Sequence, residues 1–235
     1  MSKPIFWSSK KRFRGVGLGM LGSSLLIGSL ISSAHAAPLA QDKKTVGDTQ
    51  IYQAYMQGYP DNLFRPEQSV MRSEIAAILH RLIVSPIPSN SIKFTDVPST
   101  YWANDEIALA VSNGWMDGTG GNTFSPNRQV TRGEMAQILM NVYGWGSGSA
   151  SSFRDTKQHW AKSAIDAAVA QGVMAGYSDG SFRPDQLISR VETAKMFNRL
   201  TGRPADPQLP MTWSDVPSSA PDYGDIMAAS IDHPV

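Results

Sequence analysis

The sequence predicts a mainly α-helical protein made of three copies of one structural unit, and two observations support this fold class. The segment GVMAGYSDGSFRPDQLISRVETAKMF at 172–197 recurs 58 residues earlier, and again 60 residues before that. A repeat of this length indicates stacked supersecondary units. After the loop of each copy, the chain carries the signature of a helix start. The residues shared by the three copies are Gly58, Phe64, Pro66, Arg72 and Glu74; Gly118, Phe124, Pro126, Arg132 and Glu134; and Gly176, Phe182, Pro184, Arg190 and Glu192.

Each unit contains a loop followed by a helix with a defined start. In the third unit, we expect Gly176 and the Asp179-Gly180 pair to supply the positive φ angles of tight turns. The hydroxyl of Ser189 can then cap the third helical amide, and Glu192 can reach back to the N–H of Ser189. This pattern is a capping box, and it predicts a helix that begins at this position.

Thr131 and Glu134 form the same capping box in the second unit. Both boxes place an arginine, Arg132 or Arg190, on the first helical turn beside unpaired amides and the positive end of the helix dipole. This arrangement suggests an anion site. In the first unit Met71 replaces the capping residue, so we expect that helix to start differently, near Ser69, and Arg72 to be less well oriented.

Apolar side chains at helical spacing predict the buried faces of the helices. The longer helices are expected over 69–83, 131–143 and 189–200, with Ile75, Ile78, Leu79, Leu82, Met135, Ile138, Leu139 and Val142 buried. A short helix is expected over 49–56. Another is expected to follow Tyr101-Trp102-Ala103 and to run to about Ser112, with Trp102, Ile107, Ala110 and Val111 on its buried face. Trp102 and its counterpart Trp160 are interpreted as core residues, with sugar stacking as the alternative.

The two ends of the chain are incomplete in complementary ways. The first unit lacks the Trp-Ala pair that opens the others, whereas Trp213–Pro217 and Asp225–Ala229 copy the opening of the second unit. We therefore expect the C-terminal segment to pack against the first unit and close a ring of three. The predicted divisions are a signal peptide at 1–36, units at 37–90, 91–150 and 151–203, and a partial fourth opening at 204–235.

Composition and the N-terminus predict an exported protein. Lysines and arginines precede an uncharged run and Ala34-His35-Ala36, which is the pattern of a cleaved secretory signal; a membrane anchor is the alternative. The net charge is +1 and charged residues make up 17% of the chain, so no basic field suggests a nucleic-acid partner. The chain has no cysteine, so disulfides cannot stabilise it outside the cell.

The motifs F-x-D-V-P, W-A, G-x-x-x-G-Y-x-D-G-x-F-x-P and T-R-x-E, repeated in this order, resemble the S-layer homology (SLH) domain. The resemblance covers nearly all of the chain after the signal peptide and implies a helical module with pseudo-threefold symmetry and loop-rich prongs. It also implies that grooves between units bind an anionic secondary cell-wall polysaccharide, commonly pyruvylated. The arginine of the T-R-x-E box would hold the acidic group, a role that falls on Arg132 and Arg190, with Arg72 weaker.

Several alternatives stay open at this point. The arginines could instead be structural, and Asp96, Asp155 and Asp215 are interpreted as turn-forming residues. Tyr59 and Tyr177, on the loops, are candidates for stacking on a sugar ring. The leading function is a non-catalytic anchor in the cell wall or surface layer. The second is a structural component that assembles with copies of itself or with other surface-layer proteins. The third is a wall-glycan hydrolase.

The sequence predicts no catalytic residues, no cofactor and no metal site. The loops at Asp61 and Asp179 each offer a single carboxylate, whereas calcium requires six to eight oxygen ligands. The histidines that follow the signal, His80, His159 and His233, lack the spacing of a zinc site. We expect no membrane span in the mature protein.

Overall fold

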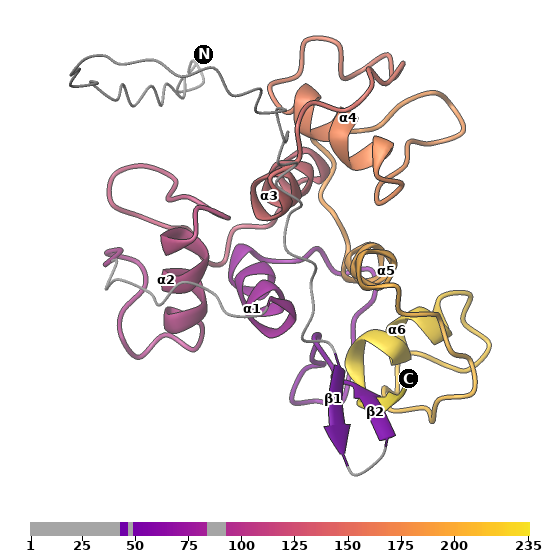
Figure 1. The fold of residues 1–235 in the computed structure, drawn as a ribbon. Coiled ribbons are helices and arrows are strands. Elements are labelled where there is room, and N and C mark those ends of the chain that lie inside the picture. Colours follow the sequence, from indigo (N-terminus) through magenta and orange to yellow (C-terminus); the bar gives the residue numbers. More distant parts are fainter. Residues whose placement is uncertain (1–42, 47–48, 84–92) are drawn as a thin grey trace, which may run out of the picture. The chain divides into compact units, whose positions relative to one another are not determined.

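The computed structural model describes residues 43–46, 49–83 and 93–235 (Figure 1). All of them belong to one compact body, residues 34–235, which contains the three repeat units. In these residues the helices are α1 (Arg72–Leu82), α2 (Asn104–Ser112), α3 (Arg132–Tyr143), α4 (Lys162–Ala170), α5 (Arg190–Thr201) and α6 (Tyr223–Ser230). The strands are β1 (Lys43–Val46), β2 (Thr49–Tyr52) and β3 (His233–Pro234). The mainly helical fold class is therefore confirmed. The predicted signal peptide at 1–36 and the linker at 85–90 lie outside the described residues.

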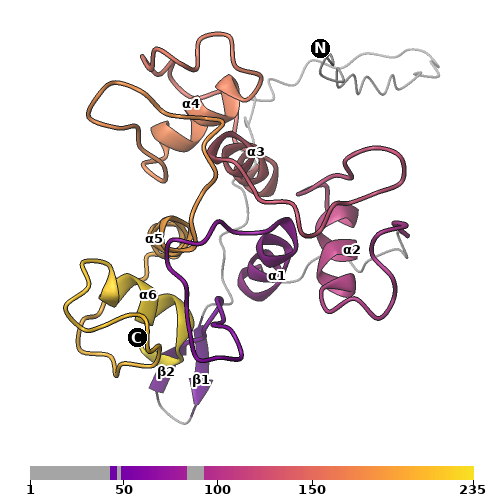
Figure 2. The same cartoon turned by 180° about the vertical axis from the view of Figure 1, so that it is seen from behind.

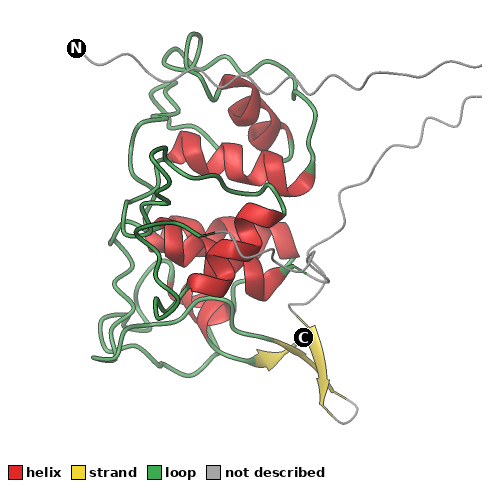
Figure 3. Cartoon of the chain, turned by 90° about the vertical axis from the view of Figure 1, so that its left-hand side faces the viewer, coloured by secondary structure: helices red, strands yellow, loops and turns green. Residues whose placement is uncertain are grey.

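The helices are arranged as three pairs. The longer helices α1, α3 and α5 lie nearest the middle of this body, and we call them the inner helices. The outer helices α2, α4 and α6 pack on their outer sides (Figures 1 and 2). Each outer helix packs on the inner helix that precedes it in the chain, so α2 contacts α1, α4 contacts α3 and α6 contacts α5. Figure 3 shows the long loops gathered along one side of the helices.

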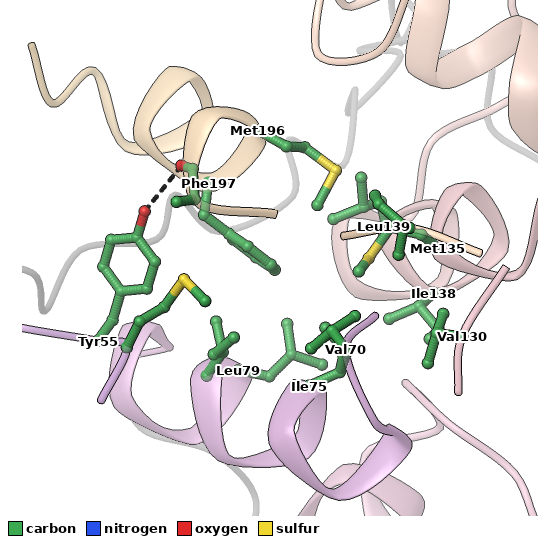
Figure 4. Close-up of a cluster of buried hydrophobic side chains, with 14 of the residues drawn as sticks. Tyr55, Val70, Ile75, Leu79, Val130, Met135, Ile138, Leu139, Met196 and Phe197 are labelled. Carbon is green, nitrogen blue, oxygen red and sulfur yellow. Dashed lines mark hydrogen bonds between the residues drawn. The ribbon is translucent and has the colours of Figure 1, made fainter. Parts of the chain in front are cut away.

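A ring of three backbone hydrogen bonds joins the units at their centre. The N–H of Val70 donates to the carbonyl of Ile188, that of Ile188 donates to Val130, and that of Val130 donates back to Val70, each over 3.0 Å. The side chains of all three residues are buried. Apolar residues of α1, α3 and α5 continue this core above the ring, where Leu79, Leu139 and Phe197 converge (Figure 4). The pseudo-threefold arrangement therefore has a direct basis in the backbone.

The inner helices begin where the capping boxes predict. Thr131 Oγ1 accepts the Glu134 N–H over 3.2 Å, and Glu134 Oε2 accepts the Thr131 N–H over 3.0 Å. Ser189 and Glu192 make the same pair of hydrogen bonds, at 3.2 and 2.9 Å.

The prediction of a shifted start for the first of these helices is wrong. α1 begins at Arg72, in register with the others, because Glu74 Oε2 still accepts the Met71 N–H over 2.8 Å. The next two amides, of Arg72 and Ser73, are satisfied by carbonyls of the second unit, each over 3.0 Å. The equivalent amides of α3 and α5 bond to a neighbouring unit in the same way, so these contacts fix the helix start even without the cap hydroxyl.

Each of the three aspartates of the unit openings lies in a turn, as interpreted from the sequence, but its carboxylate binds a distant loop. Asp96 accepts the N–H groups of Phe124 and Ser125, at 2.9 and 2.7 Å. Asp155 does the same for the third loop. The second residue of each bonded pair has a left-handed backbone, with φ of 58° at Ser125, which turns two successive N–H groups toward one carboxylate.

Asp215 makes this contact for the first loop, across the length of the chain. Its carboxylate accepts the N–H groups of Phe64 and Arg65, at 2.8 and 2.7 Å. The carbonyl of Ala229, in α6, accepts the N–H groups of Tyr55 and Met56, at 3.1 and 3.0 Å. The C-terminal segment thus packs against the loop of the first unit as expected, although its helix packs on α5 and not on α1.

The predicted helix over 49–56 is wrong. Residues 49–52 form β2, which pairs antiparallel with β1 and with β3, so that Tyr52 lies opposite His233. Burial increases along the strand, from the exposed Thr49 and Gln50 to the buried Tyr52, because β2 leads into the core residues Tyr55 and Met56. One partner strand, β1, is adjacent in the chain and the other, β3, comes from its far end, so pairing on both edges of β2 overrides the local helical pattern.

The tryptophans of the unit openings are not core residues, which corrects another expectation. Trp102 and Trp160 are 58% and 63% exposed. Each lies just before the N-cap of its helix, Ala103 or Ala161, and it is this alanine that is buried. Most of the other predicted core positions are buried, but Val142 of α3 and Val111 of α2 are only half-buried because they lie in the last turns of their helices.

We expected Gly176 to supply a positive φ, but its φ is not positive. A glycine is required there because another side chain approaches its backbone closely. A Cβ at this position would lie 2.1 Å from Phe153 Cε1, inside the ring that packs beneath the loop. We expect Gly176→Ala to lower the free energy of unfolding by about 1–3 kcal/mol, because the Phe153 ring and the loop backbone must separate. Gly146→Ala is the control, since a Cβ there meets nothing within 4 Å. Equal urea-unfolding midpoints for the two variants would contradict this packing argument.

Candidate functional site

The arginine at the start of each inner helix, which we call a clamp arginine, reaches into the loop of the next unit. Arg132 donates from Nε to the carbonyl of Phe182 over 3.0 Å and from Nη2 to that of Ala175 over 2.7 Å. Its Nη1 lies 3.3 Å from Glu192 Oε1, at the start of α5. The residue is only 6% exposed. One side chain therefore joins α3 to the loop and to the helix of the third unit.

Arg190 repeats this geometry between the third unit and the first. Its Nε donates to the carbonyl of Phe64 over 2.8 Å, and its Nη2 donates to that of Gln57 over 2.5 Å. Nη1 pairs with Glu74 Oε1 at 2.7 Å. The residue is 3% exposed. This clamp spans more than a hundred residues of sequence and closes the ring of units.

Arg72 occupies the third equivalent place but lacks the ion pair. Its Nε and Nη2 donate to the carbonyls of Phe124 and Asp117, as in the other two clamps. The glutamate equivalent to Glu192 and Glu74 is Glu134, and Arg128 binds it instead through both nitrogens, at 2.7 and 3.2 Å. Burial, together with repulsion by Arg128, lowers the pKa of Arg72 to about 10.

The helix amides beside the clamp arginines are not free to bind an anion. The N–H of Arg132 donates to the carbonyl of Gln186, and that of Gly133 donates to Pro184, both over 2.8 Å. The equivalent amides of α1 and α5 are bonded in the same way. The converging amides and dipole inferred from the capping boxes are therefore already used by the neighbouring unit. What remains for a ligand is the unused part of each guanidinium group.

Tyr59 and Tyr177 lie beside two of the clamps. The Tyr59 hydroxyl donates to Glu74 Oε1 over 3.1 Å and accepts from Gln68 Nε2 over 2.8 Å, and burial raises its pKa. Two guanidinium carbons lie over its ring, those of Arg65 and Arg190, at 4.3 and 4.9 Å from the centroid. These cations occupy the ring, which leaves less of it for stacking on a sugar.

Tyr177 has the same kind of neighbours. Its hydroxyl lies 3.5 Å from Glu192 and 3.1 Å from Gln186 Nε2, and Arg183 lies 3.8 Å from its ring centroid. The second unit has Thr119 at this position, and the hydroxyl of Thr119 bonds within its own loop. The three inter-unit sites are therefore built on one plan but differ in chemistry.

A hollow of about 200 Å³ borders Arg132 between the third loop and α5. Its lining includes Tyr177, Glu192, Lys195 and Arg199. Lys195 pairs with Asp222 at 2.5 Å, whereas Arg199 is exposed at the rim. The hollow thus has a cationic lining that suits a small acidic group.

Sequence reasoning named the clamp arginines but missed Arg128, Gln68 and Gln186. These three occupy equivalent positions, each four residues before an inner-helix arginine. The signal that could have revealed them is the change from glutamine to arginine in one copy of the repeat. The significance of that change depends on Glu134, whose partner is visible only in the structure.

Among the described residues there is neither a cluster of metal ligands nor a helix that could cross a membrane. Within residues 43–46, 49–83 and 93–235, no three histidine, aspartate or glutamate side chains group together as metal ligands would. In the same residues, every helix is too short or too polar to cross a bilayer.

Comparison with known proteins identifies the repeat. The family model of the S-layer homology domain matches residues 52–91, 93–136 and 152–194. The chain is 32% identical over 77% of its length to Cell surface glycoprotein 1 of Acetivibrio thermocellus, and 30% identical over 82% to the Cellulosome-anchoring protein of that organism. It is 31% identical over 75% to the Surface-layer 125 kDa protein of Lysinibacillus sphaericus. The matched regions span 8%, 45% and 16% of these relatives, respectively.

These matches agree with the repeats seen in the structure, since each matched segment includes a loop and the first turns of an inner helix. The protein is a secreted component of the cell surface or cell wall, and the chain belongs to the S-layer homology domain family.

Proposed function

We propose that this protein is a non-catalytic module that anchors to the cell wall by binding an anionic polysaccharide at its three inter-unit sites. The observation that carries the proposal is the placement of Arg72, Arg132 and Arg190 at equivalent positions between units. Each uses its Nε and Nη2 to hold the next loop, which fixes the plane of the guanidinium group. A planar group held in this way recognises a carboxylate at low entropic cost.

The acidic group is a carboxylate borne by the polysaccharide, and a pyruvyl ketal is the form that we propose. The hollow beside Arg132 adds Lys195 and Arg199 to the clamp. Its lining therefore contains three cationic side chains and one carboxylate, that of Glu192. Tyr59 and Tyr177 line two of the sites with partly buried rings and hydroxyls. Because a polymer can occupy more than one site at once, weak single sites would add up to stable anchoring.

A surface-layer role by association with other copies or with other surface proteins is the second candidate. Two large aromatic side chains favour it: Trp102 and Trp160 are exposed at equivalent places on the two complete units. Aromatic residues of this size are enriched in protein interfaces. A hydrolase has no such support, because the helix-start glutamates Glu74, Glu134 and Glu192 are all bonded to backbone N–H groups and to arginines.

Cosedimentation with purified wall sacculi tests the anchoring function. We expect the protein to sediment with native sacculi and to stay in solution when the polymer other than peptidoglycan has been chemically removed. Equal sedimentation before and after removal would contradict recognition of that polymer. Sedimentation of the protein alone would instead favour self-assembly, and release of reducing ends from the sacculi would favour a hydrolase.

A further inference from the structure

The three inter-unit sites differ in charge because of one position. At two sites the clamp arginine faces a glutamate, Glu192 at 3.3 Å or Glu74 at 2.7 Å. At the third, no carboxylate oxygen of the described residues lies within 4.0 Å of Arg72, because Arg128 binds Glu134. Gln68 and Gln186, which stand in the place of Arg128 at the other sites, donate to a tyrosine hydroxyl and leave the glutamate to the clamp.

Glu134 is therefore bound by Arg128, and Arg72 is left without a close carboxylate. Arg72 is 7% exposed, so its charge is poorly hydrated. The carboxylates of Glu134, Asp117 and Asp96 act on it only from beyond ion-pair distance. Burial, together with repulsion by Arg128, lowers the pKa of Arg72, and no close carboxylate offsets these effects. Among the described residues, its Nη1 has no hydrogen-bond partner, whereas the Nη1 of each other clamp binds a glutamate.

The site at Arg72 also lacks the tyrosine that stands beside each of the other two clamps. Tyr177 places its ring centroid 5.0 Å from the guanidinium of Arg132, and Tyr59 places its ring 4.9 Å from that of Arg190. At Arg72 the corresponding residue is Thr119, whose hydroxyl bonds to Ser125 over 2.7 Å. A ligand that approaches Arg72 therefore meets no tyrosine hydroxyl or ring.

We propose that the site at Arg72 is the strongest of the three anion subsites, and that Arg128 determines this by holding Glu134 away from the clamp. The occupant is a carboxylate of an acidic sugar, which takes the place of the missing glutamate at Arg72 Nη1. This inference rests on the proposed binding of an acidic wall polysaccharide. It reverses the order expected from the capping residues, in which Arg72 was the weakest.

The two other cations that line the Arg132 site, Lys195 and Arg199, do not change this order. Lys195 is already paired with Asp222 at 2.5 Å. Arg199 is exposed, and an exposed charge contributes little because water and salt screen it. A buried guanidinium without a counter-charge gains more from a carboxylate, because the interaction replaces hydration that it lacks. The difference between the sites therefore lies at the clamp and not at the rim.

The repeat itself offers a reciprocal pair of variants. Arg128→Gln gives the second unit the residue of the other two, which frees Glu134 to pair with Arg72. Gln186→Arg gives the third unit the residue of the second, which draws Glu192 away from Arg132. Both positions are exposed, so neither change disturbs the core. We expect Arg128→Gln to weaken carboxylate binding at Arg72 by about tenfold, and Gln186→Arg to strengthen binding at Arg132 by a similar factor.

Titration with methyl β-glucuronide, followed by the ¹⁵N NMR signals of the clamp Nε–H groups, measures each site separately. Each of these groups donates to a buried loop carbonyl, and Arg→Lys variants assign the signals. We expect the Arg72 signal to shift at the lowest concentration and methyl β-glucoside, which is uncharged, to shift none. The proposal is overturned if Arg132 or Arg190 responds first, or if Arg128→Gln leaves the Arg72 titration unchanged.

The wall function and this inference can fail separately. Protein that sediments with sacculi but whose Arg72 signal does not respond first supports anchoring and overturns the ranking of sites. Protein that ignores sacculi but whose Arg72 signal responds first, and loses that response in Arg128→Gln, supports the ranking and overturns anchoring.

Discussion

Deletion of Met211–Val235 is expected to abolish the cooperative thermal unfolding of this protein. The segment buries Val216, Tyr223, Ile226 and Met227, each of which is no more than 3% exposed. Burial of one such side chain contributes roughly 1.5–3 kcal/mol. Their sum is comparable with the total stability of an ordinary domain, about 5–15 kcal/mol. The deletion also removes β3 and leaves an apolar face of α5 exposed.

Calorimetry of the intact and truncated proteins measures this effect. An unchanged melting temperature after truncation would show that the C-terminal segment does not close the ring.

A single substitution isolates one contact of this segment. Asp215→Asn should lower the free energy of unfolding by about 1.5–3 kcal/mol, because the carboxylate accepts two backbone N–H groups of the first loop. Asp96→Asn removes the same contact within the second unit and should cost a similar amount. Asp185→Asn is the control, because this side chain is 88% exposed and makes its only polar contact among the described residues with His159, at 3.2 Å, and with no backbone N–H group.

Substitution of the clamp arginines by alanine is expected to lower stability in the order Arg190, Arg132, Arg72. Removing one partner of a buried ion pair costs about 3–5 kcal/mol, because the other charge is left unpaired. The pair of Arg190 with Glu74 is shorter and less exposed than the pair of Arg132 with Glu192. Arg72→Ala breaks no ion pair and removes a poorly hydrated charge, so its cost should be the smallest of the three.

Urea unfolding of the three alanine variants measures this order. The corresponding lysine variants should recover only part of the loss, because an ammonium group cannot reach two loop carbonyls and a glutamate at once. Equal losses for all three alanine variants would contradict the difference in pairing described here. The same series shows which variants are still folded in the absence of urea, so that their polysaccharide binding can be compared with that of the wild type.

How far the sequence could predict this protein depends on the distance over which each interaction acts. The capping boxes at Thr131 and Ser189 lie within four residues, so the helix starts could be predicted directly. The apolar faces of the inner helices follow from spacing alone, and the threefold repeat indicated that they share one core. Where local and distant forces disagreed, as at Met71 and at residues 49–56, the distant contact decided the structure.

The sequence by itself determined the three-unit plan, the starts of α3 and α5, and the presence of an arginine on the first turn of each inner helix. Only the tertiary structure decided what those arginines bind. Arg132 and Arg190 found glutamates in neighbouring units, whereas Arg72 lost its glutamate to Arg128. The physical reason is that charge pairing in a closed ring depends on which side chains meet across units, and equivalent positions in the repeat do not carry equivalent residues. A single change from glutamine to arginine therefore alters a site more than fifty residues away in the chain.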